Sequence, residues 1–328
     1  MNDSLLLRLP ETKEYRPSSI TEFYGAAVIA SKYCGMRNTP RILNRYWQHG
    51  WVPKSRQLSP DFVATETINN KNALILVARK DEEEYLIKNG YRAKAIGLPF
   101  CYITSQGHSR IQNSLLVMPA HATRHIPINF REEYKQFIKY VLEQSRYFDT
   151  VYVCMHQEDF DLGYSKIWEN AGFKVIRGAA IDDANALVRI HALLSQFETV
   201  LSDALGSHIV YAASLGAKIS LIESRGWEYD VSKDPFSKPD LVKLNNDINK
   251  LEINPKTSPY SFLFDEPQVA KQHIEWGLEQ IGACNMVSPS ELKHILGWNL
   301  SNRLVDSSKV LVRKVKALPK KVLSLKLF

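Results

Sequence analysis

Residues 173–223 constrain the fold most strongly, because short apolar runs alternate there with amphipathic segments. The apolar runs are KVI, TVLS and KISLI, and apolar residues at helical spacing lie between them. This order of strand, helix, strand, helix and strand is typical of parallel βαβ units. It predicts an α/β fold in which Asp182 and Asp183 cap the first helix. Ligands of such sheets bind beyond the carboxyl ends of the strands, where helix N-termini attract anions.

The rest of the chain extends this pattern in both directions. Residues 20–35 predict a helix capped by Ser19 or Thr21, and NALILVA at 72–78 predicts a buried strand. A helix that ends at Gly90 and a strand that begins near residue 94 follow. Further strands are expected at SLLVM and TVYVCM, each followed by a helix or a loop. Helices are expected again at 266–282 and 288–298.

A length of 328 residues suits two domains of about 150 residues each. The polar stretch at 104–114 is the best candidate for a linker. We therefore expect two Rossmann-like domains with C-terminal helices and a basic tail, which is the outline of the GT-B architecture. The expected divisions are an N-terminal α/β domain at 1–112, a C-terminal Rossmann-like domain at 113–300 and a basic amphipathic tail at 301–328. Two-domain epimerases and some kinases fit the same outline, and fold alone does not choose between them.

Composition narrows the class of protein. Apolar residues make up 45% of the chain and charged residues 23%, as in folded globular proteins. The four cysteines are widely spaced without a CxxC pair, which argues against a disulfide framework or a zinc site and favours a reducing cytoplasm. No stretch approaches the roughly 18 apolar residues of a membrane span, so a soluble or peripheral protein is expected.

The formal net charge of +7 is concentrated at the C-terminus, since residues 309–328 hold seven Lys or Arg residues and no acid. These bases alternate with Val, Leu and Phe, as in segments that lie on anionic lipid. A solvated chain end and a nucleic-acid contact are the alternatives, although no nucleic-acid-binding motif accompanies the tail. The expected membrane contacts are Lys309, Arg313, Lys314, Lys316, Lys320 and Lys321.

Three loops combine histidine with small or polar residues. The first surrounds His49 in YWQHGW; it is a candidate general base, because histidine titrates near neutral pH. It could instead be packed between the two tryptophans. The second loop follows SLLVM, where the phosphate-binding candidates are His121, Thr123, Arg124 and His125.

The third loop, Gly206, Ser207 and His208, begins a predicted helix. Backbone N–H groups and the serine hydroxyl at a helix N-terminus would bind a diphosphate. An ordinary serine N-cap is the alternative.

Several familiar motifs are missing from the sequence. It contains neither GxxxxGK[ST] nor GxGxxG, so nothing local supports ATP or dinucleotide binding. Asp159 and Asp161 in DFD match a loose metal-binding pattern of some sugar transferases, but acids at this position favour the first turn of a helix. No metal ligand and no cofactor are therefore predicted.

The motifs YWQHGW, LLVMPAHATRH and TVLSDALGSHIVYAASLGAKISLIE resemble bacterial surface-polysaccharide glycosyltransferases of GT-B type, from capsule and O-antigen clusters. The resemblance spans residues 41–223. It implies a nucleotide-sugar donor on the C-terminal domain, an acceptor on the N-terminal domain and no essential metal. Residues 206–208 and the loop from His121 to His125 would then bind the donor phosphates, with His49 near the acceptor. The chain lacks the Glu-x7-Glu of many retaining enzymes and the His-Pro pair of sialyltransferases, which favours inversion.

The function expected from the sequence is thus metal-independent transfer of a sugar from a nucleotide sugar to a lipid-linked or growing surface polysaccharide. The enzyme would lie at the cytoplasmic face of the plasma membrane and would not bind nucleic acid. Two alternatives remain open: transfer of a polyol phosphate from a CDP derivative such as CDP-glycerol, and a non-catalytic protein of the polysaccharide cluster that binds glycans.

Overall fold

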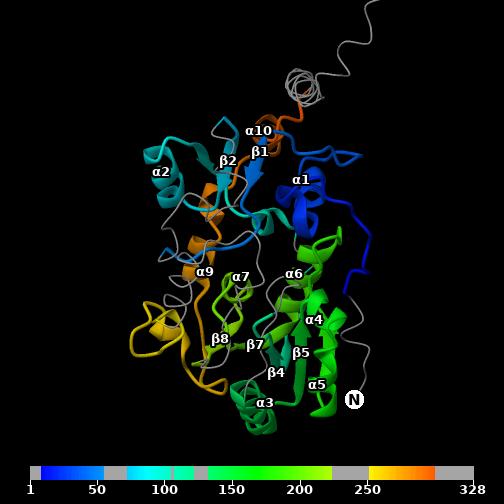
Figure 1. Cartoon of the computed structure of the whole chain (residues 1–328), viewed down its shortest axis with the longest axis vertical. Coiled ribbons are helices and arrows are strands. Elements are labelled where there is room, and N and C mark those ends of the chain that lie inside the picture. The colour runs from blue at the N-terminus through cyan, green and yellow to red at the C-terminus, as the bar shows by residue number, and fades with distance from the viewer. Residues whose placement is uncertain (1–8, 55–71, 105–106, 122–131, 224–250, 300–328) are drawn as a thin grey trace, which may run out of the picture.

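The computed structural model describes residues 9–54, 72–104, 107–121, 132–223 and 251–299, and its strands form two separate sheets (Figure 1). The smaller sheet is parallel and has the order β1-β2-β3. Its strands are β1 (Arg45–Trp47), β2 (Leu74–Val77) and β3 (Arg92–Ala95). The two α/β halves expected from the sequence are therefore present.

The larger sheet has the order β6-β5-β4-β7-β8-β9. Strands β4 to β8 are parallel, and the short β9 pairs with β8 in the antiparallel direction. The chain thus moves outward from β4 to β6 and then returns to the other side of β4 at β7, a Rossmann-like reversal that opens a crevice between β4 and β7. The strands are β4 (Ile111–Val117), β5 (Thr150–Met155), β6 (Lys174–Arg177), β7 (Phe197–Ser202), β8 (Lys218–Leu221) and β9 (Lys271–Gln272).

Helices connect and cover these strands. The α-helices are α1 (Ala26–Tyr33), α2 (Lys80–Lys88), α3 (Glu132–Gln144), α4 (Gln157–Asp161), α5 (Ser165–Asn170), α6 (Ala186–Gln196), α7 (Ser207–Ser214), α9 (Ile274–Gln280) and α10 (Pro289–Ile295). Short 3-10 helices are η2 (Ile20–Gly25), η6 (Pro99–Tyr102), η7 (Ser145–Tyr147), η9 (Ser261–Leu263) and η10 (Ala283–Asn285).

Both faces of the larger sheet are covered, because successive residues of a strand point to opposite sides. Leu115 and Val117 of β4 belong to an apolar cluster with α3 and α5. The residue between them, Leu116, belongs to a second cluster that includes residues of α6 and α7. Strands buried on both sides explain why the sequence shows continuous apolar runs here and not alternation.

The second cluster continues into the N-terminal half, so the two halves share one core. Phe100 of η6 stacks on Tyr211 of α7 with ring centroids 3.9 Å apart and planes 6° apart. Trp47 of β1 is buried in the same cluster and donates its indole N–H to the carbonyl of Gly97 at 2.9 Å. The core therefore holds the carboxyl ends of the two sheets toward each other.

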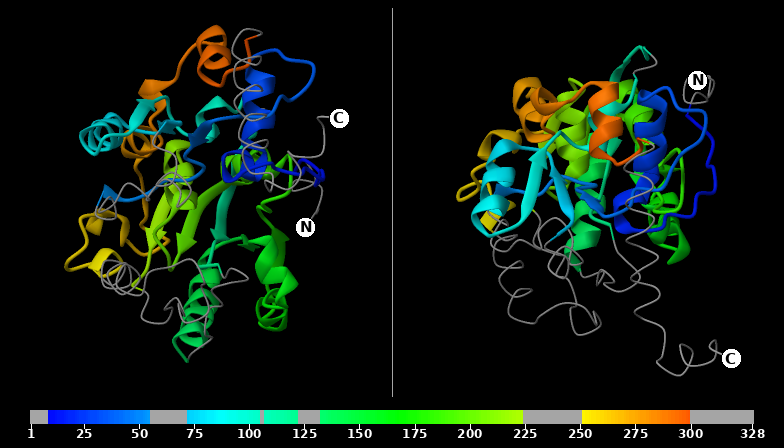
Figure 2. Two further views of the ribbon diagram at one scale, coloured as in Figure 1. Left: turned by 45° about the horizontal axis from the view of Figure 1, so that its top comes forward. Right: turned by 90° about the horizontal axis from the view of Figure 1, so that it is seen from above.

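The C-terminal segment returns to the first half, where both views in Figure 2 show it beside α1. The guanidinium of Arg45 on β1 donates to the carbonyl of Ile295 at 2.6 Å, and the hydroxyl of Tyr33 on α1 donates to that of Val287 at 2.9 Å. Residues 283–298 thus pack on the first sheet, although their position in the sequence assigned them to the domain expected at 113–300. β4 begins at Ile111, within the segment interpreted as a linker.

Three local expectations were wrong. The helix expected at 20–35 is broken: Phe23 and Tyr24 have non-helical backbone angles, and the α-helix starts at Ala26. Asp183 does not cap α6, whose N-cap is Asn185; its carboxylate instead pairs with Arg189. The helix expected at 266–282 is confined to α9, because its first part forms a loop and β9.

The basic tail and its six expected membrane contacts lie outside the described residues, so its role stays a prediction. Within the described part of the chain, no helix has both the length and the apolar character needed to cross a membrane.

We expect Gly282→Ala to lower the free energy of unfolding by about 2–4 kcal/mol. Gly282 has a φ of +71°, and a Cβ there would lie 1.9 Å from the carbonyl oxygen of Ala78 at the end of β2. Gly90 is the matched control, because its φ is +80° but nothing lies within 4 Å of a Cβ. Denaturant unfolding should show a loss of about 1–2 kcal/mol for Gly90→Ala; equal losses for the two variants would contradict the steric argument.

Candidate functional site

A cavity of about 430 Å³ lies at the carboxyl ends of the two sheets. From the larger sheet it is lined by the loops after β4, β5, β6 and β7 and by the start of α7; from the first half it is lined by Tyr24 and by residues 49–53. It therefore occupies the crevice that the strand order creates. Of the residues proposed from the sequence, His49, His121, Gly206, Ser207 and His208 all line it.

The start of α7 forms one wall of the cavity. Gly206 is the N-cap in extended conformation, and Ser207 is the first helical residue. The first N–H groups of a helix have no partner within the helix, so they attract an anion. The Ser207 hydroxyl accepts a hydrogen bond from the backbone N–H of Trp51 at 2.9 Å. A Cβ on Gly50 would lie 2.7 Å from this hydroxyl, which explains the glycine after His49.

His208 is held by Ser202 at the end of β7. The Ser202 hydroxyl lies 2.6 Å from the carbonyl oxygen of Met118 and 2.8 Å from Nε2 of His208. A hydroxyl has one proton, and Ser202 donates it to the carbonyl of Met118. In the second hydrogen bond the donor is therefore Nε2 of His208, so Nε2 carries the ring proton and Nδ1 is unprotonated. Burial is the main reason why the pKa of His208 falls to about 3. The ring is therefore neutral near pH 7, and protonation of Nδ1 would add a donor.

His49 reaches the cavity from the loop after β1. Its ring centroid lies 5.8 Å from that of Tyr24 and 6.2 Å from that of Phe23. The carbonyl of His49 accepts a hydrogen bond from the hydroxyl of Tyr211 at 3.3 Å. Burial lowers the pKa of His49 to about 4, so without a ligand it does not titrate near neutral pH as the sequence suggested. It is a neutral proton acceptor at pH 7.

His121 is exposed at the rim, where its ring stacks on His156 with centroids 4.8 Å apart. Burial, and next the neighbouring His121, lower the pKa of His156 to about 3. The remaining candidates of this loop, Thr123, Arg124 and His125, lie outside the described residues. His156 was not proposed from the sequence.

Asp203 ties the loops after β4 and β7 together, since its Oδ1 accepts a hydrogen bond from the N–H of Ala120 at 2.7 Å. It is buried, and burial raises its pKa to about 6. Both loops border the cavity, so this carboxylate fixes the separation of the two loops.

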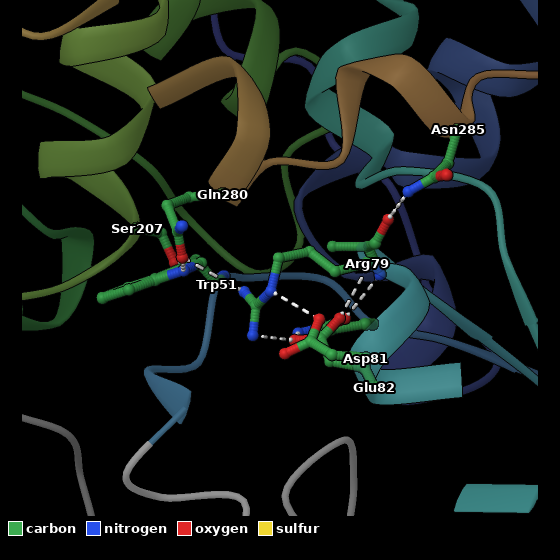
Figure 3. Close-up of polar contacts among 9 residues, drawn as sticks. Trp51, Arg79, Asp81, Glu82, Ser207, Gln280 and Asn285 are labelled. Atoms are coloured by element: carbon green, nitrogen blue, oxygen red, sulfur yellow. Dashed lines mark hydrogen bonds and ion pairs between the residues drawn. The ribbon is translucent and has the colours of Figure 1, made fainter. Parts of the chain in front are cut away.

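Trp51 is held from two other elements (Figure 3). Its backbone N–H donates to Ser207, and its indole N–H donates to Oε1 of Gln280 at the end of α9 at 2.9 Å. The same Oε1 accepts from the guanidinium of Arg79, which follows β2, at 3.4 Å. Arg79 in turn lies 3.1 Å from a carboxylate oxygen of the buried Glu82. These contacts fix residues 49–53 over the α7 wall.

The aspartates of the DFD motif are used within α4, as the helix-start interpretation predicted. Oδ2 of Asp159 accepts from the N–H of His156 at 3.2 Å, and Oδ1 of Asp161 accepts from Nε2 of Gln157 at 2.7 Å. The first contact helps to position His156 at the edge of the cavity.

Comparisons with known proteins add a distant structural likeness. The sequence matches no protein-family model and no curated protein. Among solved structures, it is similar to a Listeria monocytogenes protein described as "putative UDP-N-acetylglucosamine 2-epimerase", with 15% sequence identity and a TM-score of 0.34. The match covers 67% of this chain and 60% of that one. A likeness of this size does not transfer a function, and the α/β description rests on the two sheets themselves.

Proposed function

We propose that the chain is a glycosyltransferase that uses a nucleotide sugar to extend a lipid-linked or surface polysaccharide. The observation that carries this proposal is the cavity: histidines and a helix N-terminus from opposite halves meet at the strand ends, where nucleotide ligands of α/β folds bind. The donor phosphates would lie against residues 206–208, and the acceptor would approach from the side of His49. The resemblance to glycosyltransferases of GT-B type implies the same division of donor and acceptor between the two halves.

The proposed reaction is a direct displacement with inversion. The acceptor hydroxyl oxygen attacks the anomeric carbon, the bond from that carbon to the donor phosphate breaks, and the nucleoside diphosphate leaves. His49 takes the proton of the acceptor hydroxyl. The α7 wall, and His208 once its Nδ1 is protonated, stabilise the charge that develops on the departing phosphate. We expect the reaction to need no metal ion.

A ligand screen followed by a transfer assay tests the proposal. UDP, GDP, CDP, CMP and their sugar conjugates are screened for an increase in thermal midpoint, with and without EDTA, because a ligand of the folded state stabilises it. The selected nucleotide sugar is then incubated with bacterial membranes, and release of the nucleoside diphosphate is measured. We expect binding and transfer that are insensitive to EDTA. A product that carries phosphate would favour the polyol-phosphate alternative, and binding without turnover would favour the non-catalytic one.

Donor binding is expected to tighten as the pH falls from about 6 toward the pKa of His208 in the free protein. The pKa of His208, at the α7 wall, is about 3 in the free protein, and a bound anion favours its protonated form, which raises this pKa. Binding then takes up protons, so affinity rises toward low pH. Isothermal titration calorimetry in buffers of different ionisation enthalpy measures this uptake directly; the diester phosphates of a nucleotide sugar do not titrate in this range.

His208→Gln should reduce the proton uptake. His191→Gln is the matched control, because burial lowers the pKa of His191 to about 4 but this residue lies in α6 against Phe100 and does not line the cavity. Donor affinity that is independent of pH in the wild-type protein would contradict the prediction.

A further inference from the structure

The two ends of the cavity differ in chemistry. In the order β6-β5-β4-β7, the loop after β7 lies on one side of β4 and the loops after β5 and β6 lie on the other. The β7 end presents the α7 N-terminus. The opposite end is lined by Tyr24, His156, Ala179, Leu187 and Ile190, and the exposed His121 stacks on His156 at its rim.

Tyr24 reaches this end through an unusual backbone conformation. Its φ is +59° inside η2, although it is a bulky residue. L-residues with large side chains rarely adopt this region, which costs about 1–3 kcal/mol. The conformation is fixed from the second half: the N–H of Tyr24 donates to the carbonyl of Ile181 at 3.1 Å. Gly25 packs so tightly that a Cβ would lie 2.2 Å from the carbonyl oxygen of Ala184.

The side chain of Tyr24 bridges the two halves at the cavity. Its hydroxyl lies 3.5 Å from Nε2 of His156, which follows β5, and its ring lies 5.8 Å from that of His49, which follows β1. Burial, and next the charge of Glu158, raise the pKa of Tyr24 to about 12, so the hydroxyl keeps its proton. This end of the cavity thus offers neutral hydrogen-bonding groups and apolar surface, which suit an uncharged ring and not a phosphate.

We propose that Tyr24 is a specificity-determining residue whose hydroxyl binds the uncharged, hydroxyl-bearing part of the ligand while the α7 wall binds its phosphates. This inference rests on the proposed function, because it divides one nucleotide sugar between the two ends. Backbone strain at a ligand-lining residue is expected where the position of a side chain matters to function. The uncharged part is either the nucleoside or the sugar ring.

Calorimetric titration with four types of probe tests the inference. Inorganic pyrophosphate contains only the charged part; UMP, CMP and GMP add a nucleoside; glucose 1-phosphate carries a sugar ring without a nucleoside; the nucleotide sugar from the screen contains both. Tyr24→Phe removes one oxygen atom and should weaken the binding of the nucleotide sugar about 3- to 10-fold. The affinity for pyrophosphate should be unchanged. Tyr147→Phe is the control, because Tyr147 is 62% exposed and lies outside the cavity lining.

The pattern of losses decides the outcome. If Tyr24→Phe binds the nucleoside monophosphates more weakly, Tyr24 contacts the nucleoside. If the variant binds glucose 1-phosphate more weakly, Tyr24 contacts the sugar. Either result supports the inference. If the affinities for pyrophosphate and for the nucleotide sugar fall equally, or if neither falls, the inference is overturned and the proposed function is unaffected. A wild-type protein that binds none of the nucleotides or their sugar conjugates refutes the proposed function, and this inference with it.

Discussion

Replacement of His49 by alanine is expected to lower the rate of sugar transfer by about 10²- to 10⁴-fold, the usual contribution of a general base. His49 lies in the cavity on the side of the N-terminal half, and burial keeps it neutral in the free protein by lowering its pKa to about 4. A nearby diphosphate would raise that pKa and with it the basicity of the ring. The loss should therefore appear in kcat, with donor affinity little changed.

His191→Ala is the matched control for His49→Ala. Desolvation lowers the pKa of both histidines to about 4, but His191 does not line the cavity. We expect this control to lose stability and to keep its rate of transfer per folded molecule. Wild-type turnover in His49→Ala would remove the residue from the mechanism; an equal loss in both variants would show that the effect is structural.

Asp183→Ala is expected to lower the free energy of unfolding by about 3–5 kcal/mol, because it leaves the buried charge of Arg189 without its partner. The side chains of both residues are 5% exposed. Oδ1 of Asp183 also accepts the N–H groups of Lys13 and Asn185, each at 2.9 Å. Arg189 donates to the carbonyl of Pro10 at 2.8 Å. The pair therefore fastens the N-terminal segment to the loop between β6 and α6, next to Tyr24.

Denaturant unfolding of three variants separates this pair from a general effect of charge. Asp182→Ala is the matched control, since Asp182 is exposed, and it should cost less than about 0.5 kcal/mol. The double variant Asp183→Ala/Arg189→Met should cost less than the sum of the two single changes, because no charge is left unpaired. An Asp183→Ala protein within about 1 kcal/mol of the wild type would contradict the assignment.

The alternation of apolar runs and amphipathic segments predicted the larger sheet well. Strands buried on both faces leave a strong local signal, and TVYVCM corresponds residue for residue to β5. The rule that ligands bind at strand ends selected His121 and residues 206–208. The same rule applies to His156, which directly follows β5, so this residue could have been proposed from the sequence.

Tyr24 could not be found in this way. The apolar spacing of residues 20–35 is that of a continuous helix, whereas the break at Phe23 and Tyr24 depends on contacts with residues 181–184, far along the chain. The function of Asp183 was missed for the same reason. Its sequence context is that of a helix cap, and its partners include Lys13, 170 positions away.

The sequence by itself determined the parallel α/β class, most of the strands and the loops that carry the histidines, because periodicity and strand-end position are local properties. The tertiary structure decided which of these loops meet, how Trp51 and Ser207 join the two halves, and the protonation of the histidines. Packing places residues from distant segments around one cavity. Burial there moves the pKa of His49 from near neutral to about 4, which no pattern within the YWQHGW motif reveals.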